Sequence, residues 1–163
     1  MKDLRLINAF VRAAAETLEA ELQVPVERGP LALSGPDDPD APVTGVVGLT
    51  GAMEGVVALG VEKETACAIA SALLGETFSD VTPLVASGIS EICNIIAGRA
   101  AAILYELGQR VEISPPIVIT GNNVRLRTVD LPRLLVPFTT EFGRIELKVM
   151  AQQRNGGAAS TNR

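Results

Sequence analysis

One stretch of the chain, residues 82–108, constrains the fold more than any other because it specifies a long helix. Thr82 can accept hydrogen bonds from free backbone N–H groups as an N-cap, and Pro83 suits the first helical position. Gly108 suits the left-handed conformation that ends a helix. The helix between these signals is about 25 residues long, roughly twice the usual mean. We therefore expect the rest of the chain to be organised around it.

The two sides of this predicted helix differ in character. At about 100° per residue, the large apolar side chains fall on one broad stripe, which is typical of a core face: Val85, Ile89, Ile92, Ile96, Ile103 and Leu107. The opposite side carries Ser87, Glu91, Asn94, Gly98 and Ala102. Glu91 and Asn94 are its large polar members, and they are neighbours because they are three residues apart. The small residues beside them indicate a low surface that another protein's backbone can approach.

Structural interpretations of this pair stay open on the helix alone. Asn94 could be a buried amide that caps a neighbouring loop, and Glu91 could be an ordinary surface acid. Arg99 lies next to the same side and is expected to be solvated or to form an ion pair within the chain. The alternative for Arg99 is a contact with a carboxylate of a partner. Tyr105 lies close to the helix end and is assigned no role.

The composition indicates one domain with an aliphatic core. The chain has 163 residues, of which 47% are apolar and only 3% aromatic. We assign residues 1–152 to the domain and 153–163, which are polar and rich in Gly and Ala, to a disordered tail. The net charge of −5 argues against a nucleic acid partner, because phosphate binding needs clustered Lys and Arg. No apolar run approaches the roughly 20 residues of a membrane span, so we expect a cytoplasmic protein without membrane contact.

The chain contains no histidine, which narrows the chemistry that it can perform. Most zinc sites, every Ser-His or Cys-His nucleophile arrangement and the usual general base near neutral pH are excluded. Cys67 and Cys93 lie within helical apolar patterns without metal-ligand spacing, so we interpret them as buried thiols rather than as metal ligands or a disulfide. No glycine-rich phosphate loop precedes a helix. We therefore predict no metal site and no bound cofactor in this chain.

The remaining patterns predict two more helices and a set of strands. The first helix spans about Asp3 to Gln23, with a core stripe of Leu4, Ile7, Val11, Ala14, Leu18 and Leu22. The second spans about Lys63 to Leu74 and ends at Gly75. Residues 35–42 contain three Pro and three Asp and predict an exposed acidic loop. The predicted strands are a short one within 24–33, a hairpin of 43–50 and 54–61, strands at 111–114, 117–119 and 124–129, and a last hairpin of 134–140 and 144–150.

The order of these elements indicates an α+β fold in which long helices pack on a largely antiparallel sheet. The glycines of the first hairpin, such as Gly45 and Gly55, are expected where a helix or another backbone packs closely on the sheet.

Several motifs together resemble the bacterial chemotaxis phosphatases of the CheC/CheX/FliY class, and specifically the CheX branch. The central motif is Ser87-x-x-x-Glu91-x-x-Asn94-x-x-x-Gly98, which is similar to the signature helix of that class. The other matching segments are Asn8-Ala9-Phe10, the hairpin 44–57, Ile69-Ala70-Ser71-x-x-Leu74-Gly75 and Ile113-Ser114-Pro115-Pro116 with Val118, Ile119 and Gly121. The resemblance covers roughly residues 3–151 and implies a CheC/CheX-like fold.

The resemblance implies an enzyme of two-component signalling that removes the phosphoryl group from the aspartyl phosphate of a response-regulator receiver, typically CheY. The receiver would supply the phosphoaspartate, Mg²⁺ and a lysine. By resemblance, Asn94 positions the attacking water and Glu91 contacts the receiver's lysine, while Ser87, Gly98 and Ala102 leave room for the partner. The first helix has no Asn three residues after a Glu, so we expect one site per chain, and the CheX branch implies a homodimer.

Two other classes of function remain alternatives to a phosphatase. The domain could bind a phosphorylated receiver or another signalling protein without turnover. It could also be a scaffold component of a signalling or motor complex. Retention of both the acid and the amide favours the enzyme, since a scaffold does not need this pair at this spacing.

Overall fold

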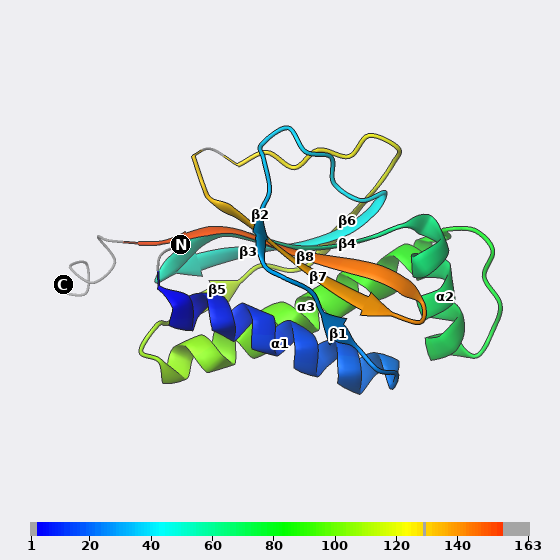
Figure 1. The fold of residues 1–163 in the computed structure, drawn as a ribbon, viewed down its shortest axis with the longest axis horizontal. Helices are drawn as coiled ribbons and strands as arrows, with labels where there is room; N and C mark the ends of the chain where they lie inside the picture. Colours follow the sequence, from blue (N-terminus) through cyan, green and yellow to red (C-terminus); the bar gives the residue numbers. More distant parts are fainter. Residues whose placement is uncertain (1–2, 129, 155–163) are drawn as a thin grey trace.

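The computed structural model, which describes residues 3–128 and 130–154, has three helices on one face of an antiparallel sheet (Figure 1). The helices are α1 (Leu4–Leu22), α2 (Lys63–Leu74) and α3 (Pro83–Glu106). The strands are β1 (Glu27–Arg28), β2 (Ala32–Leu33), β3 (Val43–Gly51), β4 (Met53–Val61), β5 (Val111–Ile113), β6 (Ile117–Thr120), β7 (Arg133–Thr140) and β8 (Gly143–Gln153). The predicted α+β architecture is confirmed.

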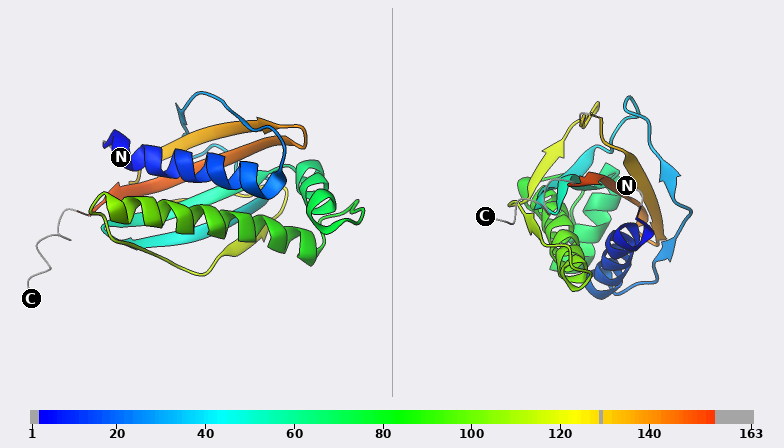
Figure 2. Two further views of the ribbon diagram at one scale, coloured as in Figure 1. Left: turned by 90° about the horizontal axis from the view of Figure 1, so that it is seen from below. Right: turned by 90° about the vertical axis from the view of Figure 1, so that its left-hand side faces the viewer.

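The sheet is built around two long hairpins. Its strand order is β1-β7-β8-β4-β3-β5, with β2 also pairing β7 and β6 also pairing β3. The two hairpins join where β4 pairs with β8, from Met53 opposite Gln153 to Val61 opposite Ile145. α1 and α3 lie next to each other across this sheet, and α2 lies at one end (Figure 2). The sequence therefore predicted both hairpins correctly, while β8 extends to Gln153 and thus includes the first residue of the expected tail. Residues 155–163 of that tail lie outside the described residues.

α1 begins and ends where its sequence signals indicate. The Asp3 side chain accepts a hydrogen bond from the Arg5 N–H at 2.9 Å, and Gln23 ends the helix in the left-handed conformation. The buried side of α1 is centred on Leu6, Phe10 and Leu18. The predicted stripe is wrong at Leu4, which is 69% exposed, because Leu6 rather than Leu4 occupies the first core position.

α3 is the core helix, and its N-terminal boundary is the predicted one. The Thr82 hydroxyl accepts a hydrogen bond from the Val85 N–H at 3.2 Å, and the helix ends just before Gly108, whose φ is +82°. By length and composition alone α3 could cross a membrane. In this fold its apolar side is instead buried against α1 and the sheet, in the hydrophobic core. The predicted core face is confirmed for Val85, Ile89, Ile92 and Ile96, while Ile103 and Leu107 are partly buried.

The opposite face of the sheet is covered by irregular segments, residues 34–42 and the described residues 121–128 and 130–132 (Figure 1). A small apolar cluster lies under them, formed by Val46, Ala58 and Met150 with Leu126 packed against it. A strand was predicted at 124–129, but residues 124–128 form none. The reason is that the Leu126 N–H donates to the Asp40 carboxylate at 2.6 Å instead of to a neighbouring strand. Val129 lies outside the described residues.

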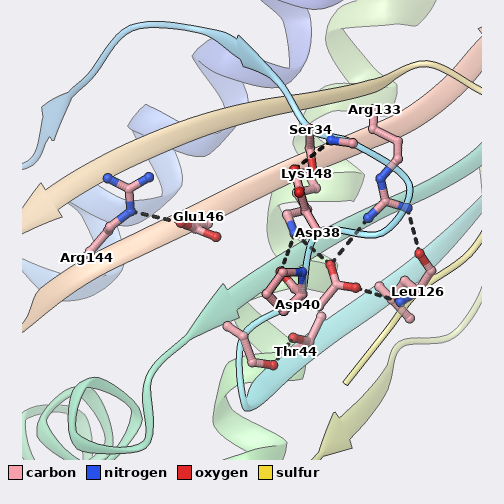
Figure 3. A network of polar contacts seen from close by, with 12 residues as sticks. Ser34, Asp38, Asp40, Thr44, Leu126, Arg133, Arg144, Glu146 and Lys148 are labelled. Atoms are coloured by element: carbon pink, nitrogen blue, oxygen red, sulfur yellow. Dashed lines mark hydrogen bonds and ion pairs between the residues drawn. The ribbon is translucent and has the colours of Figure 1, made fainter. Parts of the chain in front are cut away.

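The acidic loop was expected to be exposed, but its residue Asp40 is buried. Its side chain is 2% exposed and accepts a hydrogen bond from the Lys148 ammonium at 2.7 Å (Figure 3). The Arg133 guanidinium lies 3.7 Å away on the same carboxylate and donates to the Leu126 carbonyl at 2.6 Å. Asp40, Arg133 and Lys148 form a buried ion triad that joins the acidic loop to β7 and β8. Asp37 and Asp38 are exposed, as expected.

Candidate functional site

Glu91 and Asn94 lie on the outward side of α3, one turn apart. Glu91 is exposed and Asn94 is partly exposed. The polar side-chain contacts on α3 belong to other residues: Thr82, Ser90, Cys93 and Arg99. Within the described residues, neither Glu91 nor Asn94 has a hydrogen-bond or ion-pair partner. The structure therefore does not support the interpretation of Asn94 as a buried cap, and it leaves both groups available to a partner.

The segment of α3 that carries this pair is held close to the sheet. A Cβ atom added to Gly45 on β3 would lie 3.0 Å from the Ser90 Cα and 3.1 Å from the Cys93 Cβ, so glycine permits this approach. The Cys93 thiol donates to the Gly45 carbonyl at 3.5 Å and to the Val57 carbonyl at 3.7 Å. Burial raises the pKa of this thiol to about 12. Cys93 is thus a neutral anchor directly beside Asn94 in the sequence, as the buried-thiol prediction implied.

The residues around the pair form the low surface that the sequence predicted. Ser87 and Ala102 are exposed and Gly98 is partly exposed. A Cβ at Gly98 would meet only the Ile113 Cδ1 atom, at 4.0 Å, and a Cβ at Gly88 would meet nothing within 4 Å. Gly88 had not been identified as part of this surface. Its position one turn before Glu91 and Ile92 was the signal that could have revealed it.

Arg99 forms an ion pair within the chain, which was the favoured expectation. One of its guanidinium nitrogens lies 3.9 Å from the Glu16 carboxylate of α1, and both side chains are about 40% exposed. Glu16 in turn accepts a hydrogen bond from Arg12 at 3.0 Å. These contacts link α1 and α3 beside the site. Tyr105 is exposed near the helix end.

An apolar groove opens beside Glu91, where the end of α2 meets the start of α3. Its floor is formed by the buried side chains Ile69, Val85 and Ile89, and its rim by Leu73, Leu74 and Leu84. Ser87, Gly88 and Glu91 complete the lining on α3, and the cavity volume is about 170 Å³. We call this feature the α2–α3 groove. The sequence analysis did not identify it, because the pairing of α2 with α3 is a tertiary contact.

A larger and more polar hollow of about 800 Å³ lies away from the pair, between the N-terminal half of α2, residues 78–81 and the turn at 120–122. Lys63 and Asn122 form a hydrogen bond at 3.2 Å beside it. Cys67 lines it, and burial, with the carboxylates of Asp80 and Glu64, raises the pKa of its thiol.

The described residues contain no group of three or more Cys, Asp or Glu side chains placed to hold a metal ion. The side chains of the pair can form hydrogen bonds through the Asn94 amide and an ion pair through the Glu91 carboxylate.

Comparisons with known proteins agree on one family. The sequence profile of the family described as chemotaxis phosphatase CheX matches residues 43–139, which include α3 and both of its candidate side chains. A CheY-P phosphatase CheX from Thermotoga maritima is 33% identical over 128 residues, which are 77% of this chain and 82% of that relative.

Solved structures give the same result for the whole domain. The CheX of the CheX–CheY–BeF3–Mg²⁺ complex from Borrelia burgdorferi superposes with a TM-score of 0.80 at 30% identity, covering 90% of this chain and 97% of that one. A chemotaxis protein CheX from Desulfovibrio desulfuricans has a TM-score of 0.81 at 25% identity, covering 91% of this chain and 99% of that one. The expected CheC/CheX-like fold is confirmed.

Proposed function

This chain belongs to the CheX family of chemotaxis phosphatases, and on that premise we propose that it hydrolyses the aspartyl phosphate of a CheY-like receiver domain, with Asn94 and Glu91 as its functional side chains. The observation that carries the assignment of the residues is an amide and a carboxylate, one turn apart and without partners among the described residues, on an outward side of small residues. The Thermotoga relative, a CheY-P phosphatase, and the Borrelia CheX–CheY complex support the substrate class.

The reaction needs little from the phosphatase, because an acyl phosphate is already reactive. Water attacks the phosphorus, the bond from phosphorus to the aspartyl oxygen breaks, and the receiver's carboxylate and inorganic phosphate are released. An amide suits the positioning of this water, since it has both a donor and an acceptor and stays neutral near the phosphoryl oxygens. A carboxylate at position 94 would repel them. Positioning by one preorganised group is worth about 2 to 4 kcal/mol in such reactions.

Glu91 is matched to a cation rather than to the phosphate. It lies one turn before Asn94 and is exposed, so a lysine of the receiver can reach it without displacing another partner within the described residues. The Mg²⁺ of the reaction belongs to the receiver in this proposal, which leaves the phosphatase to supply the amide and the carboxylate. Ser87, Gly98 and Ala102 allow close approach because they are small.

The proposal includes a cytoplasmic homodimer with one site per chain. Among the described strands, β5 and β6 pair on one side only, with β3, so they form a free edge of the sheet. Ile117 on β6 is 57% exposed at this edge. Pairing with a second copy along β6 would continue the sheet and cover that side chain.

The test is the release of phosphate from a receiver labelled by acetyl phosphate in the presence of Mg²⁺. Catalytic amounts of the protein should accelerate release, and Asn94→Ala should lower kcat about 100-fold while the far-UV circular dichroism stays unchanged. Asn123→Ala, which removes an exposed turn amide, is the matched control and should behave as wild type. Wild-type activity in Asn94→Ala would refute the role of this residue. Stoichiometric binding with an unchanged phosphate half-life would instead identify a binding module.

A further inference from the structure

Exposed leucines gather at the α2–α3 groove, beside the candidate site. Leu73, Leu74 and Leu84 are 42%, 49% and 53% exposed, although each lies next to buried core residues such as Ile69 and Val85. Single exposed apolar side chains are common, but a group around a concave apolar floor is typical of an interaction site. The described residues of this chain leave the groove open.

The groove is continuous with the candidate site on α3. Leu84, Gly88 and Glu91 follow one another at spacings of four and three, so they lie along one side of the helix. Glu91 lines the groove and is the charged residue of that lining. The seven residues from Leu84 to Glu91 correspond to about 10 Å along the axis. A partner that contacts Glu91 therefore meets the groove within the same interface.

We propose that the α2–α3 groove seats one large apolar side chain of the receiver, exposed within about 10 Å of the cation that Glu91 contacts. This inference rests on the proposed function, because it takes the receiver as the partner. The volume of about 170 Å³ provides room for one such side chain, and the lining selects for an aliphatic or aromatic group. The groove thus supplies affinity for the receiver, whereas Asn94 acts on the reacting water.

Charge argues against a second copy of this chain as the occupant. A two-fold symmetric contact uses the same patch on both subunits, so Glu91 would lie against or near its own symmetry mate. Such like-charge contacts are unfavourable in an interface. A copy seated there would also cover Glu91. A receiver with a lysine beside its phosphoaspartate has the complementary charge.

Gly88 offers a way to fill the groove without damaging the fold. A Cβ at this position meets nothing within 4 Å, and replacement of a mid-helix glycine favours the helix. We expect Gly88→Leu to raise the KM for the phosphorylated receiver at least tenfold with kcat within twofold of wild type. Binding of a CheY-type receiver activated with beryllofluoride and Mg²⁺, measured by calorimetry, should weaken by the same factor.

Removal of the rim is the complementary variant. Leu74→Ser should also raise KM and weaken binding, by about threefold or more. Leu4→Ser is the matched control, because Leu4 is an exposed leucine in the first turn of α1, and the N-terminal end of α1 lies at the other end of the molecule from α2 (Figure 1). The control should leave KM, kcat and the calorimetric affinity unchanged.

The binding and turnover measurements separate the failure of this inference from that of the proposed function. Unchanged KM and affinity in Gly88→Leu would refute the proposal that the groove binds the receiver, whatever the activity of Asn94→Ala. A wild-type protein that binds without hydrolysis, and loses binding in Gly88→Leu, would support the groove and refute the phosphatase. Absence of binding to every tested receiver would overturn both. Conversion of a dimer to a monomer by Gly88→Leu, seen by sedimentation, would assign the groove to a second copy and overturn the inference.

Discussion

The two faces of the sheet differ in whether their carboxylates are buried and paired or exposed and unpaired within the described residues. On the loop-covered face, Asp40 is buried with Lys148 and Arg133, and its oxygens also accept from the backbone of Leu126. On the helical face, Glu91 is exposed and, within the described residues, has no partner. A carboxylate that stabilises the fold, such as Asp40, has partners within the chain. A carboxylate without such partners, such as Glu91, is available to bind another protein.

The largest effect is expected from breaking the buried ion triad. Asp40→Ala leaves the charges of Lys148 and Arg133 buried without their carboxylate, and such losses cost about 3–5 kcal/mol. Urea denaturation should report a lower free energy of unfolding by that amount. Asp37→Ala, in the same loop but exposed, is the control and should change it by less than about 0.5 kcal/mol. Equal stability of the two variants would mean that the triad is not a structural element.

Charge reversal on the other face should separate function from stability. Glu91→Lys places a cation opposite the receiver's lysine, so KM should rise about 10- to 100-fold, equivalent to about 1.4 to 2.7 kcal/mol. Its free energy of unfolding should stay within about 0.5 kcal/mol of wild type, because the side chain is exposed. Steady-state kinetics and urea titration together test this. Glu141→Lys, at an exposed turn, should retain the wild-type KM. A large loss of stability in Glu91→Lys would show that this carboxylate is structural after all.

The buried thiol of Cys93, next to Asn94 in the sequence, should make the free energy of unfolding fall at alkaline pH. The pKa of Cys93 rises from 9.0 to about 12 on folding, so the unfolded chain loses this proton first and the native state is favoured less as pH increases from 9 to 12. The stabilisation is complete below pH 9, and this thiol alone accounts for a loss of about 1 kcal/mol at pH 10. Comparison of urea denaturation at pH 8 and pH 10 measures it. Cys93→Ala should lack this part of the decline, and an identical decline in both proteins would contradict the assignment.

The smallest effect is expected at the exposed pair between α1 and α3. Arg99→Ala removes a contact of 3.9 Å between side chains that are about 40% exposed, so the free energy of unfolding should fall by at most about 1 kcal/mol. The loss should diminish in 0.5 M salt because the pair is screened. The kcat should stay within twofold of wild type. A tenfold fall in kcat with unchanged stability would instead place Arg99 against the receiver.

Local signals explain which parts of the fold were predictable. The cap at Thr82, the first-turn proline and the contrast between the two sides of α3 depend on neighbouring residues, and all were identified from sequence. The strand expected at 124–129 failed because Asp40, 86 residues earlier, binds the Leu126 N–H. The triad joins residues 108 apart, and the α2–α3 groove depends on how two helices meet. Such tertiary contacts leave no periodicity in the sequence. The family signature proposes Glu91 and Asn94 as site residues, whereas the groove beside them required the structure.

The close approach of α3 to β3 at Gly45 has a kinetic consequence. Because α3 packs on β3 so closely that Gly45 has no room for a side chain, we expect this helix to keep its place when the receiver docks. We expect the backbone around Asn94 to exchange its amide protons only on global unfolding. The conformational entropy lost by this protein on association is then limited to a few surface side chains. The encounter rate and the motions of the receiver would set how fast the complex forms.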